Sequence, residues 1–269
     1  MYMRWMLVLA GVVGCSSSVM AQGLIWKLPD DGAWVRFEGD YTQTITRGND
    51  APEQLKWTRY ITIRSVGKQE AEFRGVNQAC RWIEIEVETG DASGGVLDAG
   101  PGGNRLYKLL VPEGAVRGTV REPVAKGQDI FASYIPVVKG YRKIGDEETA
   151  EISSGVFQLY PVVSMLQHYE NLTAEGDPQP LNVAMTPVQA QAYKGSFMME
   201  RSNYRSTNNG EVFRGSEMPF GVAKWTATTV VEEKATTDAR SQFETTVTIT
   251  EAMQAAEVGT DAESELIIN

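Results

Sequence analysis

Hydrophobic and polar residues alternate strictly along several stretches of the chain, which is the pattern of β-strands that face water on one side only. In residues 79–88, the positions expected to face the core are Ile83, Ile85 and Val87, and those expected to face water are Glu84, Glu86 and Glu88. Residues 55–64 alternate in the same way, so these two strands, if adjacent, would bring basic and acidic side chains opposite each other. The alternation predicts a large antiparallel sheet. Asn208-Asn209-Gly210 is the strongest hairpin signal in the chain.

One stretch in the middle of the chain, residues 156–172, has helical periodicity instead. Pro161 suits the first position of a helix, where its missing N–H costs nothing. Apolar residues then recur on one stripe: Val162, Met165, Leu166, Tyr169 and Leu172. The opposite face carries Ser164, Gln167, His168 and Asn171. We therefore expect an α+β fold: a large twisted antiparallel β-sheet, open or curved into a half-barrel, with one main amphipathic helix packed on its concave face.

Residues 1–21 have the pattern of a secretory signal peptide. Arg4 supplies a basic start, residues 5–13 form an apolar run too short to span a bilayer, and Val19-Met20-Ala21 suits cleavage. A second interpretation is a lipoprotein signal, in which Cys15 is acylated and anchors the protein. In both cases the sequence predicts an exported protein, periplasmic or held in the cell envelope. A single β-rich domain is expected over residues 22–250.

Charge narrows the range of partners. The chain has a formal net charge of −10, and residues 251–269 contain five acidic side chains and no basic one, so an acidic, flexible tail is expected there. An acidic surface disfavours the phosphate backbone, so nucleic acid is not an expected partner. A membrane is an expected partner only if Cys15 is acylated, and the sequence leaves the oligomeric state open.

Residues needed for most catalytic and metal sites are missing, so we expect no cofactor and no metal. His168 is the only histidine; on the expected helix it is a surface residue, and Ser164 one turn away makes a poor nucleophile–base pair with it. Cys80 is expected to be a sluggish, structural thiol, because nearby carboxylates raise the pKa of a thiol. Catalysis would have to use carboxylates, for which the candidates are Asp91, Asp98, Glu84 and Glu86.

Aromatic residues on the strands are compatible with a binding face as well as with ordinary packing. Trp34 and Trp82 fall on the polar faces of their expected strands, which adds weight to binding. The residues expected to face a ligand are Trp34, Trp57, Trp82, Met165 and Tyr169.

The segments WKLPDDGAWVRFEG (residues 26–39) and YKLLVPE (107–113) resemble an uncharacterised family of exported bacterial proteins, which implies no function. The order of long antiparallel strands, a mid-chain helix and returning strands is similar, more distantly, to the LolA/LolB lipoprotein-carrier fold. In that family a half-barrel wraps helices around an apolar cavity. Tyr41-Thr42-Gln43 is similar to its aromatic-x-Gln strand, although this sequence opens on a strand where that family opens with a helix. The resemblance is an analogy of fold, and fold does not determine function.

The leading functional hypothesis is therefore a non-enzymatic exported envelope protein that binds an apolar ligand or another envelope protein. One alternative is a carboxylate-dependent hydrolase acting in the periplasm, and another is a structural or accessory surface protein. A deep apolar cavity would favour binding. Two acids about 5–10 Å apart in an open cleft would favour hydrolysis.

Overall fold

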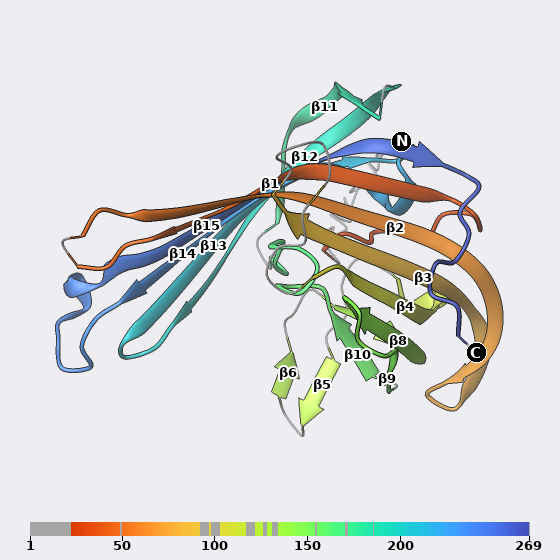
Figure 1. Ribbon diagram of the computed structural model, residues 1–269, viewed down its shortest axis with the longest axis horizontal. Coiled ribbons are helices and arrows are strands. Elements are labelled where there is room, and N and C mark those ends of the chain that lie inside the picture. Colours follow the sequence, from red (N-terminus) through yellow and green to blue (C-terminus); the bar gives the residue numbers. More distant parts are fainter. Residues whose placement is uncertain are drawn as a thin grey trace, which may run out of the picture.

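A single curved antiparallel sheet of eleven strands dominates the computed structural model, in the order β11-β12-β13-β14-β15-β1-β2-β3-β4-β8-β9. The structure describes residues 23–48, 50–91, 97, 103–116, 122–125, 128–130, 134–153, 155–169, 172–184 and 186–268. Figure 1 shows β13, β14 and β15 extending together to the left, while β2, β3 and β4 curve round to the right. The first strand pairs with the last, because β1 lies between β15 and β2 in the sheet.

The eleven strands of this sheet are β1 (Trp34–Ile45), β2 (Glu53–Phe73), β3 (Val76–Gly90), β4 (Arg105–Pro112), β8 (Lys139–Ile144), β9 (Ala150–Ile152), β11 (Thr173–Val183), β12 (Thr186–Glu200), β13 (Tyr204–Gly215), β14 (Val222–Glu233) and β15 (Glu244–Gly259). Two small pairs of strands form separate sheets: β5 (Glu122–Ala125) with β6 (Gln128–Ile130), and β7 (Tyr134–Val137) with β10 (Gly155–Gln158). Short 3-10 turns occur at Glu113–Ala115, Pro219–Gly221 and Arg240–Gln242.

The strand alternation read from the sequence is confirmed where it was clearest. Ile83, Ile85 and Val87 are fully buried in the core on the concave face of the sheet. The neighbour of β3 is β2, and their register places Arg64 opposite Glu84. The expected meeting of opposite charges follows, since Nη2 of Arg64 lies 2.8 Å from a carboxylate oxygen of Glu86.

The expected amphipathic helix is wrong, and the fold class is all-β rather than α+β. None of the described residues lies in an α-helix, and residues 159–169, hereafter the strap, form an irregular segment inside the curve of the sheet (Figure 1). Its one turn is closed by the amide N–H groups of Val163 and Ser164, which both donate to the carbonyl of Leu159. The strap covers the concave face as a helix would, but residues from both sides of the expected helix are buried in it.

The burial of single residues shows why helical periodicity led to a wrong prediction for the strap. Met165, Leu166 and Tyr169 of the apolar stripe are buried, as expected. Ser164 and His168, assigned to the water-facing side, are buried too. A segment enclosed on both sides has no water-facing stripe, and partners elsewhere in the chain can take up its backbone polar groups in place of helical hydrogen bonds.

The C-terminal boundary expected after residue 250 is also corrected. Residues 251–259 belong to β15, and Leu266 is buried further along. The carboxylate of Glu84, expected to face water, is instead fully buried beneath this segment. It accepts hydrogen bonds from the backbone amides of Glu265 and Leu266 at 2.9 and 3.2 Å and from the hydroxyl of Ser264 at 2.8 Å. The outer face of β3 is thus covered by the segment that was expected to be a free tail.

Residues 1–22, which include the expected signal peptide and Cys15, lie outside the described residues. Within the part of the chain that the structure describes, no helix is long and apolar enough to cross a membrane.

Candidate ligand-binding site

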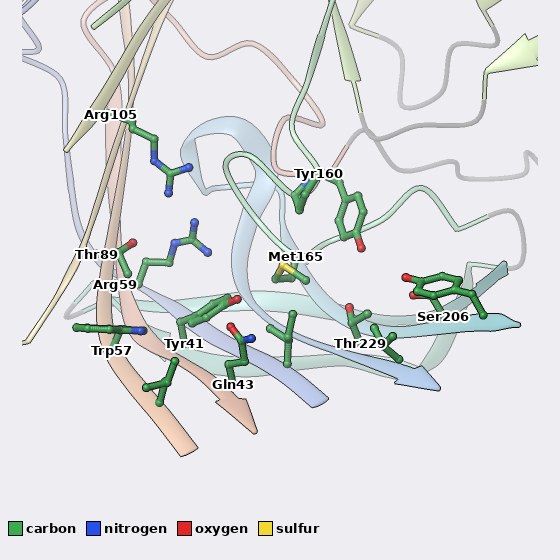
Figure 2. Close-up of a pocket in the computed structure, with 15 residues that line it drawn as sticks. Tyr41, Gln43, Trp57, Arg59, Thr89, Arg105, Tyr160, Met165, Ser206 and Thr229 are labelled. Atoms are coloured by element: carbon green, nitrogen blue, oxygen red, sulfur yellow. The ribbon is translucent and has the colours of Figure 1, made fainter. Parts of the chain in front are cut away.

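A cavity of about 520 Å³ lies between the strap and the concave face of the sheet (Figure 2). Its volume falls in the range of small-molecule sites, about 300–1,000 Å³. Apolar and aromatic side chains make up most of its wall, and a smaller number of polar groups interrupt them. The lining residues are Tyr41, Gln43, Leu55, Trp57, Arg59, Thr89, Arg105, Tyr160, Pro161, Met165, Tyr204, Ser206, Thr229, Val231 and Ile249.

The strap is held over this cavity by a buried carboxylate, that of Glu251 on β15. This side chain is fully buried and accepts three hydrogen bonds. The donors are Nη1 of Arg59 at 2.5 Å, Nε1 of Trp225 at 2.7 Å and the backbone amide of Met165 at 2.9 Å. A buried charge is tolerated only when it is paired and hydrogen-bonded. Glu251 therefore joins β2, β14, β15 and the strap at one point.

The other end of the strap is held by Tyr169, whose ring lies against two glycines. Gly195 on β12 and Gly210 on β13 face each other in the sheet register. A Cβ atom built on Gly210 would lie 2.1 Å from the Tyr169 hydroxyl oxygen, and one on Gly195 would lie 2.5 Å from the Tyr169 Cβ. Only glycine leaves room for the ring at these two positions, hereafter the glycine slot.

Hydrogen bonds from Asn208 complete this anchor. The Tyr169 hydroxyl donates to Oδ1 of Asn208 at 2.6 Å, and burial raises the pKa of this phenol. The amide group of Asn208 donates to the carbonyl of Met165 at 3.1 Å and to the hydroxyl of Thr229 at 2.7 Å. Asn208 and Gly210, interpreted from the sequence as a hairpin turn, lie inside β13 instead. Their role is to receive the strap.

The structure brings two of the five expected ligand-facing residues into the cavity. Trp57 and Met165 line it. Tyr169 is buried in the glycine slot and does not line it. Trp34 donates from Nε1 to a carboxylate oxygen of Asp261 at 3.0 Å, and Trp82 stacks on Tyr141 with ring centroids 6.3 Å apart. The indoles of Trp34 and Trp82 thus pack beside surface residues away from the cavity.

Three charged residues at the cavity were missed by sequence reasoning, although a signal for them existed. Arg59, Arg105 and Glu251 each occupy a position that the strand alternation assigns to the apolar, inward face. Arg59, for example, lies in phase with Trp57 and Ile61. A charge in the apolar phase of a strand indicates either a buried pair or a binding site.

Of the carboxylates considered for hydrolysis, the described Glu84 and Glu86 are both engaged with other parts of the chain. Glu84 is enclosed by residues 264–266, and Glu86 is paired with Arg64. Asp91 is exposed, and Asp98 lies outside the described residues. Among the residues that the structure describes, no group of three or more His, Cys, Asp or Glu side chains could hold a metal ion.

Comparison with models of known protein families and with curated proteins finds no match to this chain.

Cys80 is expected to react slowly with thiol reagents. Its side chain is buried, and its pKa is raised by burial first and by the charges of Glu70 and Glu113 second. Since the thiolate is the nucleophile, alkylation of the folded protein at neutral pH should be at least about tenfold slower than that of a small free thiol. The rate should still be rising at pH values where the free thiol has levelled off. Unfolding in denaturant is the control, because it should restore the free-thiol rate; alkylation of the native protein as fast as the free thiol would contradict the expectation.

Proposed function

We propose that the protein is a non-enzymatic binding protein of the cell envelope that holds an apolar ligand in the cavity beneath the strap. The observation that carries the proposal is the cavity itself, whose wall is largely aromatic and aliphatic and whose volume suits a small molecule. The apolar side chains of Leu55, Val231 and Ile249 come from three different strands and line one space. Burying a ligand's apolar surface there would contribute about 25 cal/mol for each Å² removed from water.

The address in the cell envelope is part of the same proposal. Its support is the N-terminal sequence, where a basic residue, an apolar run and small residues before Gln22 suit export. Two forms are proposed, a soluble periplasmic protein beginning at Gln22 and a lipid-anchored protein beginning at Cys15. The intact mass of the mature protein distinguishes them.

Filling the cavity should weaken binding without unfolding the protein. Ile249 lines the cavity from β15, and Ile249→Trp places an indole in the space that the ligand would occupy. We expect this variant to bind an apolar fluorescent probe such as 1-N-phenylnaphthylamine at least about tenfold more weakly than the native protein, which corresponds to about 1.4 kcal/mol. The measurement is a fluorescence titration of delipidated protein.

The matched control is Val258→Trp, on the same strand but at a position that is 40% exposed and away from the cavity. This variant should bind the probe within about twofold of the native protein, since surface substitutions change little. A native protein that binds no probe, or an Ile249→Trp variant that binds as well as Val258→Trp, would refute the proposed function.

A further inference from the structure

The two arginines that line the cavity differ in how their charge is balanced. Arg59 is neutralised by Glu251, at 2.5 Å. Arg105, at the start of β4, donates from Nη1 to the carbonyl of Val162 at 3.1 Å. Among the described residues, no carboxylate lies within ion-pair distance of Arg105. Among the described residues, the cavity lining therefore holds one guanidinium charge that no neighbouring acid balances, and such a charge favours an anion.

Polar atoms without partners concentrate at the same place. Six buried side-chain nitrogen or oxygen atoms among the described residues have no hydrogen-bond partner, and three of them belong to the cavity lining. These three are Nε of Arg59, Nε of Arg105 and Oγ1 of Thr89. A buried polar group without a partner is rare and costly, so each needs an explanation. Arg59, Arg105 and Thr89 thus bring to one part of the lining hydrogen-bonding groups that the described residues do not fully satisfy.

These polar groups lie together at one end of the cavity. Figure 2 shows the guanidinium groups of Arg59 and Arg105 turned toward each other, with Thr89 beside them. Along β2, the inward side chains that follow Arg59 toward the tip of the strand are Trp57 and Leu55, both in the lining. Four residues of strand cover about 13 Å, at about 3.3 Å per residue. The cavity thus has a cationic end and, about 13 Å away along β2 at this rise per residue, an apolar end.

We propose that the ligand is an amphiphile with an anionic head group, whose head lies against Arg105, Arg59 and Thr89 and whose apolar chain runs along Trp57 and Leu55. This inference rests on the proposed function and names the class of ligand. The head group would accept charge-assisted hydrogen bonds from the guanidinium groups, which are shorter and stronger than neutral ones. The apolar chain would lie where the wall carries Val231 and Ile249.

The test compares three probes by calorimetric titration of delipidated protein: dodecanoate, dodecanol and acetate. Dodecanoate and dodecanol share the chain and differ in the charge of the head group, while acetate has the head group alone. We expect dodecanoate to bind about ten- to a hundredfold more tightly than dodecanol, as expected for hydrogen bonds to a charged group, and acetate to bind far more weakly than both. In Arg105→Gln the preference for dodecanoate should fall below about threefold, with dodecanol binding unchanged.

Two control variants test whether the effect depends on the charge of Arg105. Arg105→Lys retains the charge and should retain most of the preference, and Arg47→Gln, at a position whose side chain is 73% exposed, should behave as the native protein. Equal binding of dodecanoate and dodecanol, or an Arg105→Gln variant with its preference intact, would overturn the anionic head group while leaving the proposed function in place. Acetate binding as tightly as dodecanoate would make this a site for free anions and also overturn the inference. Binding of neither amphiphile would refute the proposed function itself.

Discussion

Replacing Glu251 by glutamine is expected to lower the free energy of unfolding by about 3–5 kcal/mol, the usual cost of removing one partner from a buried ion pair. Glutamine has nearly the same shape, so the variant leaves no cavity and isolates the charge. The guanidinium of Arg59, only 4% exposed, would be left without its counter-ion. Hydrogen bonds from Trp225 and from the backbone of Met165 would weaken as well, because their acceptor would lose its charge. The measurement is urea unfolding, read as a lower midpoint at unchanged slope.

The matched control for this prediction is Glu257→Gln on the same strand. The Glu257 side chain is 56% exposed, and its carboxylate lies 4.0 Å from Arg36. An exposed pair of this kind contributes at most about 1 kcal/mol, so the unfolding midpoint should hardly move. Arg59→Met combined with Glu251→Gln should cost less than the sum of the two single changes, since removing both charges leaves neither of them buried alone. Equal effects of Glu251→Gln and Glu257→Gln would show that the buried pair does not hold the strap.

Replacing Gly210 by alanine is the second change with a large expected effect. The added methyl group would lie 2.1 Å from the hydroxyl oxygen and 2.4 Å from Cζ of Tyr169, so the ring would have to leave the glycine slot. Overpacking of this kind costs about 1–3 kcal/mol, and loss of the buried hydrogen bond from Tyr169 to Asn208 adds about 1 kcal/mol or more. We therefore expect a loss of about 3 kcal/mol in the free energy of unfolding, measured by the same urea titration.

A double-mutant cycle with Tyr169→Ala identifies the cause. Tyr169→Ala alone should be strongly destabilising, because it empties a buried aromatic site at a cost of about 3–5 kcal/mol. Once the ring is absent, Gly210→Ala should cost little more, so the two changes should be far from additive. Gly114→Ala is the control, since its added Cβ would meet nothing closer than 3.7 Å. Additive effects of Gly210→Ala and Tyr169→Ala would mean that the strand, and not the ring, rejects the methyl group.

The strap is the segment where sequence reasoning and the tertiary structure diverge most. Its apolar residues were expected to be buried on the concave face of the sheet, and Met165, Leu166 and Tyr169 are. The part of the prediction that was wrong is the conformation of the backbone. A helix was expected from the spacing of the apolar residues and from Pro161. The backbone of Met165 instead bonds to the side chains of Glu251 and Asn208, which are 86 and 43 residues away in the chain. The burial of the apolar residues of the strap could be predicted from the spacing of apolar positions, but the hydrogen-bond partners depend on which strands the strap crosses.

Asn208-Asn209-Gly210 is a second segment for which the local sequence predicted the wrong backbone conformation. These residues have the chemistry of a tight turn, and a local interpretation places a hairpin there. In the sheet, Gly210 is required because an aromatic ring from the strap lies against its backbone, and Asn208 because its amide binds that strap. The residue types are those of a turn, but the reason for them is a contact with Tyr169, 39 residues earlier in the chain than Asn208.

From the sequence alone, the inward and outward positions of the long strands follow, because one buried face imposes a period of two residues on each strand. For β3 the sequence predicted the burial of Ile83, Ile85 and Val87, though not that of Glu84, and the complementary charges of β2 and β3 are compatible with the observed pairing. Only the tertiary structure decided what the inward-facing charges do. Arg59 and Arg105 come from β2 and β4, and Glu251 from β15, so their meeting around one cavity depends on strand order. Strand order in turn depends on contacts between distant segments, for which a single sequence contains no periodic signal.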